Sequence, residues 1–153
     1  KIKITPEEPQ AMNVVRENFD VTLESFNPNR VADTPEELND YMNKNIEYGF
    51  MVGGKLETED YSKYKTISPS DFEKYHAGVC WDYVAYEYSY FKRYFKELPC
   101  KLYYIEARAT DGTEPTHTWL TYKDNSKIIS FESAWGDNAG LHEYSSETEI
   151  LPT

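Results

Sequence analysis

The sequence predicts an α+β fold in which helices come first and an antiparallel β-sheet follows. Apolar residues recur at helical spacing within residues 34–48 and 78–96. After residue 99 they fall in short runs separated by turn residues, which is typical of strands joined by hairpins. The length of 153 residues suits one hydrophobic core. We therefore expect a single domain over residues 1–153, made of an N-terminal arm (1–33), a core (34–137) and a C-terminal tail (138–153).

The first helix is expected over residues 34–48, after an arm whose short apolar runs lie at Val14-Val15 and residues 19–23. Asp33 or Thr34 can cap this helix, and a proline follows at the first helical position. A glycine at position 49 ends it. The apolar stripe that should face the core consists of Leu38, Tyr41, Met42 and Ile46.

Residues 49–78 read as a long irregular connection. Its chain breakers are Gly53-Gly54 and Ser68-Pro69-Ser70. A connection of this length either lines a functional groove or forms a mobile surface loop, and both alternatives stay open.

A second helix is expected from about Gly78 to Lys96, ended by Leu98-Pro99. One face carries apolar residues at steps of three and four: Cys80, Val84, Tyr88, Phe91 and Phe95. Strands should follow at residues 101–107, 117–122 and 127–132. A hairpin turn at Asp124-Asn125 joins the last two strands.

The composition is acidic and rich in aromatic residues. The formal net charge is -11, and the chain has 14 tyrosines. Such a charge repels the phosphate backbone of nucleic acids and anionic membrane surfaces. No stretch has the length and apolar character of a membrane span. We expect a neutral or cationic partner, no nucleic acid and no membrane crossing.

Cys80 is a candidate nucleophile because it lies at the start of the second predicted helix. The unpaired N–H groups and the helix dipole at this end favour a thiolate and could also stabilise an oxyanion. A lone cysteine is more often a buried, inert residue, and that is the interpretation we give to Cys100. Two cysteines form neither a disulfide framework nor a four-cysteine zinc site.

The predicted hairpin supplies a base and an acid. A two-residue loop at 124–125 pairs Leu120 with Ile129. Counting outward, the same register pairs His117 with Glu132, with Cβ atoms about 5 Å apart. A carboxylate at that distance can orient the imidazole and stabilise its cation. With Cys80 these residues would form a thiol–imidazole–carboxylate triad, provided that the helix start meets this face of the sheet.

Three segments resemble the transglutaminase-like superfamily. Gly78-Val79-Cys80-Trp81-Asp82 is similar to its G-x-C-W nucleophile motif, and Thr116-His117-Thr118-Trp119 to its H-x-W motif. Ile129-Ser130-Phe131-Glu132 stands where the strand with the third catalytic residue is found, although that residue is usually Asp. The resemblance covers roughly residues 34–137. It implies a papain-like core and acyl transfer through a thioester, by either a cysteine protease or amidase or a transglutaminase-type enzyme.

The resemblance implies the catalytic residues Cys80, His117 and Glu132, with no cofactor and no metal. Asp137 competes with Glu132 as third member. The second oxyanion donor is unassigned, and His76 and Tyr75 are its candidates. The implied substrate is a peptide or protein, with cell-wall or glycan-linked peptides included.

Two other classes of function stay open. The domain could be catalytically idle and bind a peptide or glycan through its tyrosines and the long connection. It could also hold a metal on Cys80, His117 and Glu132 or His142, although no short-spacing ligand motif supports this. The chain begins at Lys1 without an initiator Met, so a leader removed from a secreted or cell-surface protein is one possibility for its localisation.

Overall fold

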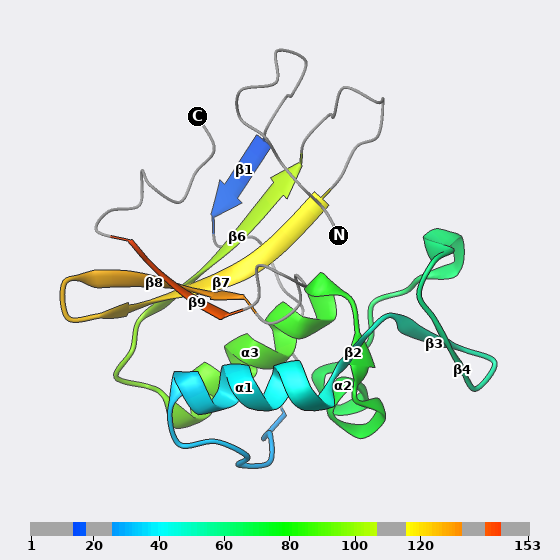
Figure 1. Cartoon of the computed structure of the whole chain (residues 1–153), viewed down its shortest axis with the longest axis horizontal. Helices are drawn as coiled ribbons and strands as arrows, with labels where there is room; N and C mark the ends of the chain where they lie inside the picture. The colour runs from blue at the N-terminus through cyan, green and yellow to red at the C-terminus, as the bar shows by residue number, and fades with distance from the viewer. Residues whose placement is uncertain (1–13, 18–25, 107–115, 133–139, 145–153) are drawn as a thin grey trace.

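The computed structural model describes residues 14–17, 26–106, 116–132 and 140–144, and in these ranges helices pack below a twisted sheet (Figure 1). The sheet has the strand order β1-β6-β7-β8-β9, and every neighbouring pair is antiparallel. Its strands are β1 (Val14–Glu17), β6 (Cys100–Glu106), β7 (Thr116–Asp124), β8 (Lys127–Glu132) and β9 (Gly140–Tyr144). The helices are α1 (Pro35–Asn45), α2 (Pro69–Tyr75) and α3 (Cys80–Tyr94). The predicted α+β class with an antiparallel sheet is confirmed.

Helix α1 begins as predicted but ends earlier. The Thr34 hydroxyl caps it by accepting a hydrogen bond from the Glu37 N–H at 3.2 Å. The predicted stripe packs inward, with Leu38 and Met42 fully buried. The helix ends at Asn45, because residues 47–48 form strand β2 (Glu47–Tyr48), which pairs in parallel with β5 (Ala77–Gly78). This pairing joins segments thirty residues apart, which local propensity cannot anticipate.

The prediction of an irregular connection over residues 49–78 is wrong. A hairpin of β3 (Phe50–Val52) and β4 (Lys55–Glu57) comes first, then the 3₁₀ turn η1 (Tyr61–Lys63) and helix α2. The Ser68 hydroxyl caps α2 by accepting from the Asp71 N–H at 3.2 Å, with proline at the first helical position. Ser-Pro therefore starts a helix here, and α2 is too short for its hydrophobic period to be visible in the sequence.

Helix α3 lies at the centre of the fold and is buried on more than the one predicted face. The Phe72 ring of α2 packs against Tyr83 and Tyr86, each with ring centroids 5.1 Å apart. On the sheet side, the Phe91 ring contacts Tyr122 at 5.2 Å and Phe131 at 5.5 Å. The other helices and the sheet therefore enclose α3 and fix its direction. Within the described residues, no helix has the length and apolar character that a membrane crossing requires.

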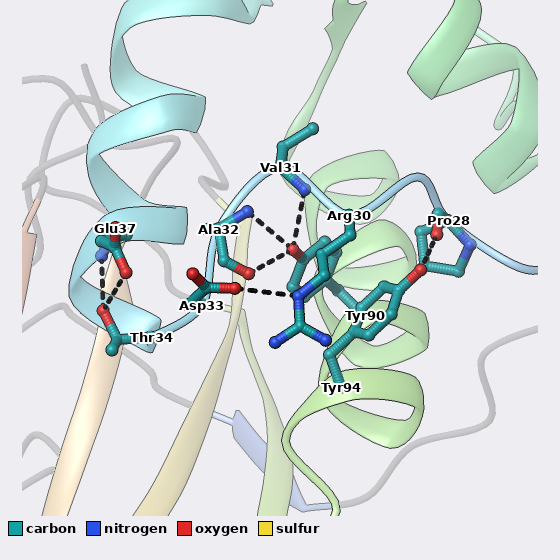
Figure 2. Close-up of polar contacts among 9 residues, drawn as sticks. All are labelled: Pro28, Arg30, Val31, Ala32, Asp33, Thr34, Glu37, Tyr90 and Tyr94. Carbon is teal, nitrogen blue, oxygen red and sulfur yellow. Dashed lines mark hydrogen bonds and ion pairs between the residues drawn. The ribbon is translucent and has the colours of Figure 1, made fainter.

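The described parts of the N-terminal arm pack on the core. Strand β1 pairs with β6, and residues 28–32 are hydrogen-bonded to two tyrosines of α3. The Tyr90 hydroxyl accepts from the N–H groups of Val31 and Ala32 at 3.0 and 2.9 Å and donates to the Ala32 carbonyl at 2.7 Å (Figure 2). Tyr94 donates to the Pro28 carbonyl. The predicted apolar run at residues 19–23 lies outside the described residues.

Tyr90→Phe is expected to reduce the free energy of unfolding by about 2 kcal/mol. It removes one hydroxyl and leaves two N–H groups and a carbonyl without their partner, at a cost of about 1 kcal/mol or more for each group that stays buried. Tyr94→Phe removes a single hydrogen bond and is the matched control, with an expected loss of about 1 kcal/mol. Urea denaturation measures both, and equal losses would contradict this account of the arm.

Candidate active site

Cys80 is the first residue of α3, and the residues around it explain why the helix starts there. Val79 is the extended N-cap residue, and the Asp82 carboxylate accepts a hydrogen bond from its N–H at 3.0 Å. A Cβ at Gly78 would stand 2.7 Å from both the Phe72 ring and the Asp82 Cβ. Glycine is therefore needed for helix α2 to approach the start of α3.

Asp82 is a buried carboxylate, 2% exposed, on the first turn of α3. Besides Val79, the Ile67 N–H donates to it at 3.1 Å and the Tyr64 hydroxyl at 3.0 Å. Burial raises the pKa of the Asp82 carboxyl above its ordinary value, and the three hydrogen bonds oppose this shift only in part. Asp82 thus joins the segment at 64–67 to the start of the helix that carries Cys80.

Two tyrosine hydroxyls contact the first turn of α3, Tyr48 at Cys80 and Tyr64 at Asp82. The Cys80 N–H donates to the Tyr48 oxygen at 3.3 Å, and Tyr48 is 38% exposed. Burial raises the pKa of Tyr64 far above its ordinary value, and the nearby Asp82 carboxylate, Cys80 thiol and Tyr48 hydroxyl raise it further. The thiol, 5% exposed, therefore lies in a polar cluster that Tyr48, Tyr64 and Asp82 form around the start of α3. We call these four residues the Cys80 cluster.

The predicted register of the β7–β8 hairpin is wrong by two residues. Asn125 adopts a φ of 57° in the loop, and Asp124 pairs with Lys127, so the loop is 125–126. Leu120 consequently pairs with Phe131. One further step of the same register places Glu132 opposite Trp119, so that position 117 is diagonal to Glu132. Diagonal positions are about 7–8 Å apart, which is still within reach of long side chains.

Positions 117 and 132 share one face of the sheet, as the sequence predicts, because a shift of two preserves the alternation of strand residues. Tyr122 and Phe131 contact α3 and define the opposite face. On the face of position 117, Trp119 stacks on Tyr103 with ring centroids 5.4 Å apart. The register therefore does not direct this face toward the body of α3. The side chain of His117 lies outside the described residues.

The other candidate residues lie on different elements of the fold. Tyr75 is 47% exposed, and His76 ends α2 with a left-handed φ of 55°. Cys100 is partly buried at the start of β6, and burial raises the pKa of its thiol. His142 is a half-buried residue of β9 that pairs with Ser130. Among the described residues, no three His, Cys, Asp or Glu side chains cluster as metal ligands would. Asp137 lies outside the described residues.

Sequence reasoning missed Tyr48, Tyr64 and Asp82. An acid at the third position of a helix is a usual capping signal, so Asp82 could have been found from the sequence. Nothing local distinguishes Tyr48 and Tyr64 among 14 tyrosines. No family model, no curated protein and no solved structure shows significant similarity to this chain.

Proposed function

We propose that this chain is a thiol-dependent acyl-transfer enzyme with a transglutaminase-like, papain-type core and with Cys80 as nucleophile. The observation that carries the proposal is the position of Cys80 at the first residue of α3, where its N–H donates to the hydroxyl of the partly exposed Tyr48. A helix N-terminus favours a thiolate and offers N–H groups to an oxyanion. Gly78, Val79 and Asp82 pack and hydrogen-bond around this end of the helix.

In the proposed reaction, the Cys80 thiolate attacks the carbonyl carbon of an amide or ester. A C–S bond forms, the bond to the leaving nitrogen or oxygen breaks, and the His117 imidazolium protonates the leaving group. Water or an amine then attacks the thioester and releases the thiol. The first case is hydrolysis and the second is acyl transfer. Glu132 orients the imidazole across the diagonal of the hairpin.

Tyr48 replaces Tyr75 and His76 as the proposed second oxyanion donor. Its oxygen lies 3.3 Å from the Cys80 nitrogen, so its O–H and the Cys80 N–H can both point at one substrate oxygen. Its partial exposure leaves room for a substrate to displace the present hydrogen bond. Tyr75 and His76 lie on the exposed end of α2 instead.

A second candidate function is a catalytically idle module that binds a peptide. Two observations favour it: the thiol is only 5% exposed, and the face of positions 117 and 132 is not the one that packs on α3. Exposed apolar side chains of the β2–β3 segment would form the binding surface, namely Tyr48, which contacts Cys80, and Met51 and Val52 on the β3–β4 hairpin.

Alkylation of the two thiols by iodoacetamide separates these functions. Cys80 is the less exposed thiol, so exposure alone predicts that Cys100 reacts first. If Cys80 is an activated nucleophile, it is expected to react at least about tenfold faster than Cys100 near neutral pH, because thiolates are the reactive form. Mass spectrometry of the two peptides gives both rates in one sample.

Cys80→Ala and Cys100→Ala are the controls, since each should remove one rate and leave the other unchanged. In denatured protein both thiols are equally accessible. The ratio of the two alkylation rates there is the value expected without activation of Cys80. A Cys80 rate equal to or below the Cys100 rate in the native protein contradicts the enzyme and leaves the binding module.

A further inference from the structure

A pocket of about 350 Å³ lies at the end of α3 farthest from Cys80, where the chain turns into β6. Tyr88 and Leu98 are its partly exposed apolar side chains, the core residues Phe91 and Phe95 lie beneath them, and Lys92 and Lys96 are its two cations. It is open to the surface, and we call it the α3-end pocket. Its volume falls near the lower end of the range of small-molecule sites, about 300–1,000 Å³.

The two lysines make this pocket locally positive in a chain of net charge -11. The Lys92 ammonium lies 5.2 Å from the centroid of the Tyr88 ring. It also lowers the pKa of the Cys100 thiol, against the larger effect of burial, so this ammonium is close to a second lining residue. Among the described residues that line the pocket, none is acidic.

The C-terminal end of a helix carries a partial negative charge of about 0.5, which would repel an anion. Two full positive charges exceed it, so the local field still favours an anionic ligand. The apolar walls require the rest of that ligand to be apolar, because burying a polar body without hydrogen bonds is unfavourable.

We propose that the α3-end pocket binds a small apolar monocarboxylate, whose chain or ring lies against Tyr88 and Leu98 and whose carboxylate pairs with Lys92 and Lys96. This site is independent of the proposed enzyme. The lining residue nearest to Cys80 along α3 is Tyr88, eight residues away, which is about 12 Å at 1.5 Å per residue.

Cys100 lines the pocket and serves as its reporter. In the Cys80→Ala variant, the alkylation rate of Cys100 is measured while decanoate is added below its micelle concentration. The rate is expected to fall saturably by at least about fivefold, because a bound ligand fills the space before the thiol. Without saturable protection the proposal is overturned.

Lys92→Gln combined with Lys96→Gln tests the charge. This pair is expected to raise the half-protecting decanoate concentration by about tenfold or more, since charge-assisted hydrogen bonds are lost. Lys55→Gln with Lys74→Gln removes the same charge from β4 and α2 and should change nothing. Neutral 1-decanol should protect far less than decanoate. Equal protection by decanol, or equal effects of the two lysine pairs, overturns the carboxylate site.

Discussion

Cys80→Ala is expected to abolish the transfer of acyl groups to this protein. With p-nitrophenyl acetate, the parent should release a burst of p-nitrophenol and gain the mass of one acetyl group on Cys80. The variant should show no burst, and its turnover should fall by about 10⁴-fold or more, as when other covalent catalysts lose their nucleophile. Stopped-flow absorbance and intact mass spectrometry measure the two effects.

Cys100→Ala is the matched control and should keep both the burst and the acetyl group. Tyr48→Phe separates the oxyanion role from the nucleophile, because it keeps the thiol and removes one donor. Its kcat should fall by about 10²-fold while Cys80 still becomes acetylated. An added primary amine that shortens the lifetime of the acyl-enzyme more than water does would identify transfer. Acetylation that persists in Cys80→Ala would exclude Cys80 as nucleophile.

Asp82→Ala is expected to reduce the free energy of unfolding by about 3 kcal/mol or more, because it leaves three donors in or near the core without an acceptor. One of them, the Val79 N–H, belongs to the residue that directly precedes Cys80. Urea denaturation measures the loss. Asp40→Ala removes an exposed acid that pairs with Lys44 and should cost at most about 0.5 kcal/mol.

The raised pKa of Asp82 has a pH signature that identifies the carboxylate itself. Between the ordinary carboxyl pKa and the higher folded value, the folded state binds more protons at Asp82 than the unfolded state does. The contribution of Asp82 to stability therefore falls as pH rises through this window. The parent should lose stability relative to Asp82→Asn as pH rises from about 4. A difference that is flat or grows with pH would contradict burial as the dominant cause.

Local sequence signals were sufficient to predict the elements that have clear capping residues and a clear hydrophobic period. Thr34 and Pro35 start α1 as expected, and the start of α3 at Cys80 follows from the same kind of reading. The α+β class and the strands β6, β7 and β8 were also predictable. These features depend on residues within a few positions of each other, where capping and side-chain alternation act directly.

The register of the β7–β8 hairpin shows which part of the candidate site could be predicted from the sequence. Moving a two-residue loop by one residue along the chain shifts the pairing by two and leaves every side chain on its face. The shared face of positions 117 and 132 was therefore predictable, while their exact opposition was not. Asn125 adopts the left-handed φ of the loop. The Asp124-Asn125 dipeptide alone does not show whether the loop is 124–125 or 125–126.

The sequence by itself determined the start of α3 at a cysteine, and with it the candidate nucleophile. Only the tertiary structure decided what surrounds that thiol: Tyr48 from β2, Tyr64 before α2, and the Asp82 carboxylate that holds the neighbouring segment. It likewise decided that the face of positions 117 and 132 is not the one that packs on the body of α3. Contacts between segments far apart in the chain depend on how whole elements pack, and no local pattern of residues encodes that packing.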